Sequence, residues 1–165
     1  MQSDINYSLL VWGYECKRLV KLQKKIIRNV CASKYNAHTE PLFKALGLLK
    51  IGDILKHNAL KFYYKLKNNK VPVYFENYQI LSQEEIHGRD TRFNQLFPRN
   101  KTRTAIQQKC LRNYIPELLN STSANILDKI STHSYKGFSN YAKQIYIENY
   151  LTECHIINCY ICENQ

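Results

Sequence analysis

The sequence predicts a mainly α-helical fold, an irregular multi-helix bundle with an exposed irregular segment near residues 79–101. Three observations support this fold class. Apolar residues make up 44% of the 165-residue chain, which is sufficient for a packed core. Apolar side chains recur at helical spacing over long stretches. Only five glycines and four prolines interrupt these stretches, so strong turn signals are sparse.

The first expected helix covers residues 15–31. Four of its apolar side chains lie at helical spacing along one face and are expected to pack into the core, namely Leu19, Leu22, Ile26 and Val30. A short apolar run over residues 5–13 precedes this helix and fits either a strand or the end of a helix. A short helix over residues 40–47 follows, with Thr39 as its expected N-cap and Gly47 at its end.

The remaining apolar periodicity predicts helices over residues 50–68, 102–114, 125–130 and 134–150. In the second of these, Ile106 and Cys110 are expected to face inward. Pro116 is expected to end that helix, because proline lacks an amide donor and clashes with the preceding turn. One more turn over residues 116–119 is left open. Ser134 is the expected N-cap of the last helix.

The chain is strongly basic, with 24 Lys and Arg against 13 Asp and Glu and a net charge of +11. Such a charge favours a polyanionic partner, nucleic acid first and an anionic membrane surface second. No apolar run reaches the ~18 residues that span a bilayer. The first residues lack the basic and apolar regions of a signal peptide. We therefore expect an intracellular protein, located in the cytoplasm and nucleus.

Cations are densest on the first expected helix, which carries six of them within twelve positions: Lys17, Arg18, Lys21, Lys24, Lys25 and Arg28. Cations one helical turn apart can follow the phosphates of a nucleic-acid strand, which makes binding salt-dependent and sequence-tolerant. The alternative is a solvated helix face without a ligand. A membrane-surface helix needs bulky apolar residues left free, and those of this helix are expected to be buried. We therefore predict nucleic acid, and no membrane, as the partner.

A second basic region contains Arg89, Arg92, Arg99, Lys101 and Arg103, with Phe93 and Phe97 between them. Arginine can bind phosphate through two donors and phenylalanine can stack on a base, so the mixture suits single strands or junctions. Alternatively, the phenylalanines anchor a loop to the core. We favour this second interpretation for the phenylalanines.

The sequence offers no catalytic constellation. Polynucleotide synthesis with two Mg²⁺ ions needs acidic groups held close together. The four aspartates are far apart in the sequence, and the one adjacent acidic pair, Glu84-Glu85, is expected to be solvated. The five glycines are scattered singly, which excludes a glycine-rich phosphate loop. We assign no catalytic residue.

The last residues contain potential zinc ligands, namely Cys154, His155, Cys159 and Cys162. Cys159 and Cys162 have the spacing of one half of a zinc site, and Cys154 or His155 would supply a third ligand, with His133 as a distant fourth. The second paired half-site is missing, and buried thiols are the alternative. A structural zinc ion remains a hypothesis for this tail.

Seven short stretches occur in an order and spacing typical of one family: YSLLVWG at 7–13, LQKKIIR at 22–28, HTEPLFK at 38–44, LKFYYKL at 60–66, DTR at 90–92, CLRNYIPE at 110–117 and NCYIC at 158–162. Together they resemble the region downstream of the palm in non-LTR (LINE-type) retrotransposon reverse transcriptases, the jockey-like elements of arthropods in particular. The resemblance covers nearly the whole chain.

The resemblance implies that residues 1–35 hold the end of the palm and the thumb helix, 36–150 a helical C-terminal domain and 151–165 a Cys-rich tail. The parent protein would be an RNA-directed DNA polymerase with Mg²⁺ in a Tyr-x-Asp-Asp palm, which this chain lacks. The chain would then be a non-catalytic fragment that works with the missing palm. Its basic helix would contact the template–primer duplex, and the rest would hold element RNA and target DNA.

Two other interpretations remain open. The chain could be a domesticated helical adaptor whose grooves bind a protein, with an affinity that changes little with salt. It could also be a decayed fragment without function.

Overall fold

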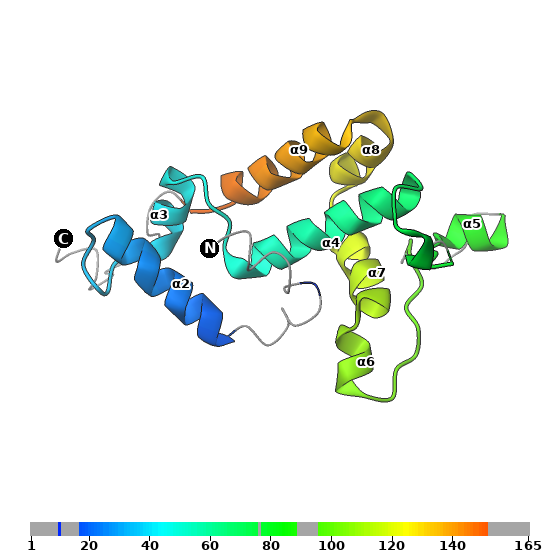
Figure 1. Cartoon of the computed structure of the whole chain (residues 1–165), viewed down its shortest axis with the longest axis horizontal. Helices are drawn as coiled ribbons and strands as arrows, with labels where there is room; N and C mark the ends of the chain where they lie inside the picture. The colour runs from blue at the N-terminus through cyan, green and yellow to red at the C-terminus, as the bar shows by residue number, and fades with distance from the viewer. Residues whose placement is uncertain (1–9, 11–16, 76, 89–95, 152–165) are drawn as a thin grey trace.

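The computed structural model describes residues 10, 17–75, 77–88 and 96–151. Within these residues the chain forms eight α-helices and one 3-10 helix, and it forms no strand (Figure 1). The helices are α2 (Lys17–Val30), α3 (Thr39–Ala45), α4 (Ile51–Lys67), η2 (Val73–Phe75), α5 (Gln83–His87), α6 (Ala105–Lys109), α7 (Leu111–Ser121), α8 (Ala124–Thr132) and α9 (Tyr135–Glu148). The predicted mainly α fold class is confirmed.

The main core forms around α4, the longest helix. Figure 1 shows α9 beside α4, and α7 crosses α4 on another side. In the chain, α8 connects α7 to α9. The buried side chains of this core come from all four helices, among them Leu60, Tyr64, Ile115, Ile126 and Phe138. The ring of Phe138 is fully buried and stacks on Tyr64, with the ring centroids 5.1 Å apart.

Helices α2 and α3 lie at one end of the molecule, beside the start of α4 and the end of α9 (Figure 1). Two small apolar clusters hold them there. One cluster joins Ile27, Phe43 and Tyr150, which come from α2, α3 and the residues after α9. The other is built on Leu49, Ile51 and Ile54, with Val20 of α2 packed against it. These clusters fix α2 at the end of the bundle.

Two predicted helix ends, the start of α9 and the end of α3, are confirmed by local hydrogen bonds. Ser134 is the N-cap of α9, and its hydroxyl accepts a hydrogen bond from the amide of Gly137 at 3.3 Å. After α3, Gly47 has a φ of +60°, which glycine adopts without steric cost. The amide of Leu48 then bonds to the Phe43 carbonyl at 3.0 Å, which completes a Schellman ending.

Thr39 does not have the predicted role. The N-cap of α3 is His38, and Thr39 is the first helical residue. The Thr39 residue is 6% exposed, and the His38 side chain makes no capping hydrogen bond. Burial of Thr39 in the first turn of α3 therefore outweighs its preference for the N-cap position.

The prediction for residues 102–114 and the helix end that follows is wrong in three respects. The stretch is divided at Cys110, which has an extended backbone between α6 and α7. Pro116 then lies inside α7 and does not end it. Burial of Ile115 and the leucines after Pro116 keeps the chain helical, although an interior proline costs about 3 kcal/mol. Cys110 and Ile106, expected to face inward, are both exposed.

Residues 79–88 and 96–101, the described part of the segment predicted to be irregular, are largely irregular but contain the short helix α5. A capping box starts this helix: the Ser82 hydroxyl accepts from the Glu85 amide at 3.2 Å, and the Glu85 carboxylate accepts from the Ser82 amide at 2.8 Å. Gly88 ends it with a φ of +62°. Glu85 also pairs with Lys67, so the acidic pair Glu84-Glu85 is not simply solvated.

Candidate nucleic-acid interface

A glutamine in the middle of α2 fixes this helix on the start of α4. The side-chain amide of Gln23 donates to the Leu49 carbonyl at 2.9 Å, and its carbonyl oxygen accepts from the Ile51 amide at 2.9 Å. The Ile51 amide belongs to the first turn of α4, where amides lack a partner within the helix. Gln23 therefore sets which face of α2 points outward. Sequence reasoning missed this residue, whose only signal was its being uncharged among lysines.

Arg28 is partly committed to the fold. Its Nε donates to the Ala37 carbonyl at 2.8 Å, which holds the loop that follows α2. The neighbouring Ile27 is 5% exposed and packs in the cluster with Phe43 and Tyr150. Of the six predicted phosphate contacts, Arg28 is the one whose side chain is half-buried.

The other five cations of α2 are exposed: Lys17, Arg18, Lys21, Lys24 and Lys25. We call them the basic face. None of them forms an ion pair with an acid in the part of the chain that the structure describes. The spacing from Lys17 to Lys21 to Lys25 is one helical turn at each step, or about 6 Å along the axis. The structure thus presents the basic face as one continuous row.

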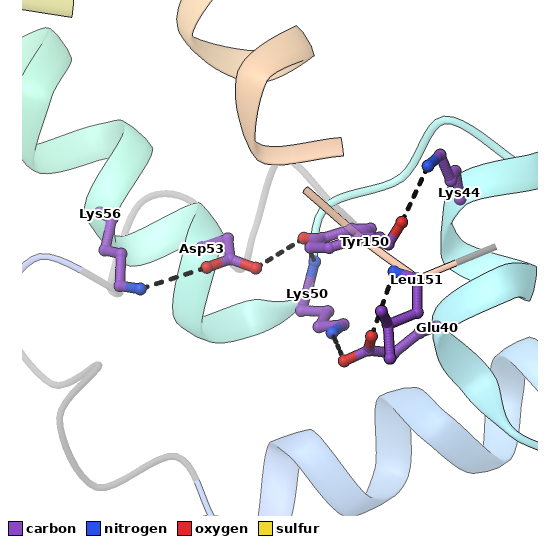
Figure 2. A network of polar contacts seen from close by, with 7 residues as sticks. All are labelled: Glu40, Lys44, Lys50, Asp53, Lys56, Tyr150 and Leu151. Atoms are coloured by element: carbon purple, nitrogen blue, oxygen red, sulfur yellow. Dashed lines mark hydrogen bonds and ion pairs between the residues drawn. The ribbon is translucent and has the colours of Figure 1, made fainter. Parts of the chain in front are cut away.

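Two acids that the structure describes at this end of the molecule, Glu40 and Asp53, are engaged by other groups. Figure 2 shows the polar network that joins α3, the start of α4 and the residues after α9. Lys50 pairs with Glu40, whose other oxygen accepts from the Leu151 amide at 3.3 Å. The Tyr150 hydroxyl donates to the Asp53 carboxylate at 2.6 Å and accepts from the Lys50 amide at 2.9 Å.

Further cations complete this network. The Lys56 ammonium lies 3.5 Å from the Asp53 carboxylate, and the Lys44 ammonium donates to the Tyr150 carbonyl at 2.8 Å (Figure 2). The hydrogen bond from Lys50 is the largest cause that lowers the pKa of Glu40, and the charge of Lys24 adds a smaller effect. Glu40 and Asp53 therefore hold the bundle together, and neither forms an ion pair with the basic face.

The apolar face of α2 differs from the prediction. Leu19 is 40% exposed, Leu22 is 51% exposed and Val30 is 67% exposed, while Ile26 is half-buried. The side that packs on the bundle carries Ile27 and Gln23 instead. The apolar spacing identifies which side chains of α2 form a stripe. It does not identify which part of the helix surface packs against the bundle. Burial of this stripe therefore does not distinguish α2 from a membrane-surface helix, in contrast to the prediction.

A membrane-spanning helix needs about 20 mostly apolar residues in succession. Within residues 17–75, 77–88 and 96–151, no helix combines the length and the apolar character needed to cross a bilayer.

The second basic region is only partly described. Arg99, Lys101 and Arg103 are exposed, and Arg99 lies 3.5 Å from the Glu117 carboxylate. This stretch precedes α6, away from α2 in Figure 1, so its three described cations do not share a surface with the basic face. The other members of the region, Arg89, Arg92 and Phe93, lie outside the described residues.

Phe97 anchors this loop, as the favoured interpretation proposed. It is 4% exposed, and its ring packs edge-on against Tyr63 with the centroids 5.9 Å apart. The Asn120 side chain accepts from the Phe97 amide at 2.9 Å and donates to its carbonyl at 2.8 Å. Phe97 is therefore not placed to stack on a base.

The predicted zinc ligands Cys154, His155, Cys159 and Cys162 lie outside the described residues. Among the residues that are described, no group of three or more potential ligands comes together. His133 has structural contacts: its carbonyl accepts from the Tyr64 hydroxyl at 2.8 Å, and its ring lies 3.0 Å from the Thr132 hydroxyl. The zinc site stays a prediction, as do the domain boundaries near residues 35 and 150.

Comparisons with known proteins return no match, whether with family models, curated proteins or solved structures.

Proposed function

We propose that the chain binds nucleic acid, either RNA, DNA or their hybrid, through the basic face of α2. The observation that carries the proposal is the row of five exposed cations that have no acidic partner in the described part of the chain. The helix that presents them is held on the bundle by Gln23 and Ile27. A rigid row of cations suits a regular row of phosphates.

The physical basis of binding is electrostatic. Each lysine or arginine that neutralises a phosphate releases condensed counterions, so affinity decreases steeply with salt. Contacts to the phosphates carry no sequence information, so the interface tolerates many sequences. We propose no reaction for the chain alone.

The resemblance to non-LTR retrotransposon reverse transcriptases supplies a context for this proposal. In that context α2 is the thumb helix along the template–primer duplex, and the chain is a non-catalytic part of an RNA-directed DNA polymerase. The proposed setting is the cytoplasm and nucleus, where element RNA and target DNA occur. The proposal for α2 itself depends on its charge and exposure and not on the resemblance.

The test is the affinity for a fluorescent RNA–DNA hybrid, measured by anisotropy at several salt concentrations. The double variant Lys21→Glu with Lys25→Glu is expected to weaken binding at least tenfold at low salt. It should also reduce the slope of log affinity against log salt by about 2, because two phosphate contacts are lost.

The matched control reverses two exposed lysines elsewhere, Lys70→Glu with Lys136→Glu, and changes the net charge equally. We expect this control to weaken binding much less. Equal losses in both double variants would show that net charge alone attracts the nucleic acid, and the proposed interface would be wrong.

A further inference from the structure

An apolar groove runs between α2 and the start of α4. Its cavity volume is about 220 Å³. The floor consists of Leu49, Ile51 and Ile54, which are each at most 3% exposed. The rim on the α2 side includes Leu19 and Leu22, which are 40% and 51% exposed. Large apolar side chains at the rim of a hollow are typical of a surface that binds another protein.

The chemistry of the groove restricts its ligand. Gln23 supplies the one polar side chain of the lining, and its amide is already used by the backbone of Leu49 and Ile51. The lining therefore suits apolar side chains and not phosphates or sugars. This groove is thus a separate surface from the basic face, although both lie on α2.

The charge beside the groove restricts the ligand further. Leu22 has Arg18 four residues before it and Lys25 three residues after it, and these positions adjoin it on the helix surface. Both cations are exposed, and neither pairs with an acid in residues 17–75, 77–88 or 96–151. A ligand whose apolar side chains enter the groove would therefore present its flanking groups to positive charge, which favours carboxylates.

We propose that this groove binds an acidic amphipathic helix of a partner protein. The exposed apolar stripe from Leu19 to Val30 extends over about 16 Å, which corresponds to three turns of a docked helix. Leucines at i, i+4 and i+7 of that helix enter the groove, and its Glu or Asp residues meet Arg18 and Lys25. The ligand class follows from the groove's apolar walls and from the charge beside them.

The test uses a synthetic, fluorescently labelled helical peptide of about 16 residues, with leucines at i, i+4, i+7 and i+11 and glutamates beside them. Saturable binding to the full chain is expected, with shifts of the methyl NMR signals of Leu19, Leu22 and Ile54. A scrambled peptide of equal composition should not bind. Absence of saturable binding, or methyl shifts confined to other helices, would overturn the proposal.

A double variant separates this groove from the basic face. Leu19→Asn with Leu22→Asn is expected to reduce the affinity for the peptide at least tenfold. The affinity for the RNA–DNA hybrid should stay within about twofold of that of the unaltered chain. The matched control is Ile106→Asn on α6, at a side chain that is 73% exposed, and it should leave both affinities unchanged. Arg18→Glu with Lys25→Glu is expected to reduce the affinity for both the peptide and the RNA–DNA hybrid.

Other occupants have distinct outcomes. Dimerisation in sedimentation experiments that disappears in the asparagine double variant would assign the groove to a second copy of the chain. Binding to phosphatidylserine vesicles that disappears in the same variant would assign it to a membrane surface. Either result, without peptide binding, would overturn the proposal. Circular dichroism checks that the asparagine double variant folds. If this variant does not fold, the methyl shifts of the unaltered chain on addition of the peptide still test the proposal.

Discussion

His57 is buried on α4 beside α9, where its Nε2 lies 2.9 Å from the Ser139 carbonyl. Burial lowers the pKa of this histidine, and the charges of Lys61 and Lys143 lower it further. The hydrogen bond with Ser139 acts in the opposite direction but is the weaker cause. His57 therefore favours the neutral form in the folded protein.

This environment predicts a pH dependence of stability. Because the pKa of His57 is lower in the folded chain than in the unfolded chain, protonation favours unfolding as the pH falls below about 6.5. The free energy of unfolding should decrease from pH 7.5 to pH 5.5, as measured by urea titration. His57→Gln should flatten this dependence. His87→Gln, at an exposed histidine, should preserve it, and equal flattening in both variants would contradict the assignment.

Single residues also show how far the sequence could define the candidate site. The cations of α2 were recognisable, because charge density is a property of local sequence. The role of Gln23 was not, because its hydrogen bonds reach residues 26 and 28 positions further along the chain. The exposure of Leu19 and Leu22 depends equally on which arc of α2 the bundle covers, and that is fixed by tertiary contacts.

The hydroxyl of Tyr150 is the central group of the polar network that joins secondary-structure elements in Figure 2. It connects the residues after α9 to the first turn of α4 through Asp53 and the Lys50 amide. Burial raises the pKa of Tyr150, and the hydrogen bond to Asp53 raises it further, so the hydroxyl keeps its proton at physiological pH. The Lys50 ammonium also lies 4.3 Å from the centre of the Tyr150 ring.

Removing this hydroxyl should weaken the junction between the elements. Tyr150→Phe leaves the Lys50 amide without its partner and is expected to lower the free energy of unfolding by about 1–3 kcal/mol. Urea titration measures the loss. Tyr74→Phe, at a tyrosine that is 95% exposed, should change stability by less than about 0.5 kcal/mol. Similar losses in both variants would show that the network contributes no stability.

Elements differed in how well the sequence predicted them. The helices predicted over residues 50–68 and 134–150 have nearly the same bounds as α4 and α9. Long stretches of helical periodicity with clear end signals largely determine their own secondary structure. The division at Cys110 was not foreseen, and the sequence suggested only a separate turn after Pro116 where α7 continues without a break. There the local preference of proline opposes the burial of Ile115 and Leu119, and packing outweighs propensity.

For the whole molecule, the net charge of +11 implies repulsion between parts of the folded chain. Salt screens this repulsion, with a Debye length that shortens from about 30 Å at 0.01 M to about 10 Å at 0.1 M. Without nucleic acid, we therefore expect the melting temperature to rise by a few degrees between these salt concentrations, measured by calorimetry. A triple variant at Lys17, Lys21 and Lys25, each changed to Glu, should show a smaller rise. A melting temperature that falls with salt would contradict this expectation.

At this scale the sequence predicted the class of fold but not the arrangement of its parts. The placement of α2 and α3 at one end of the molecule depends on Phe43 and Tyr150, whose rings are 6.5 Å apart although they are distant in the chain. No local pattern encodes such a pairing. It follows from complementary shapes that exist only in the assembled bundle.

The contact between Lys50 and Tyr150 spans 100 residues of sequence, and this separation has a consequence for biosynthesis. At a translation rate of about 5–20 residues per second, Tyr150 leaves the ribosome about 6–24 s after the end of α2. During this interval the cationic α2 segment exists without the tyrosine that later packs against Ile27. Premature termination anywhere in between would release a polycation that has no completed scaffold.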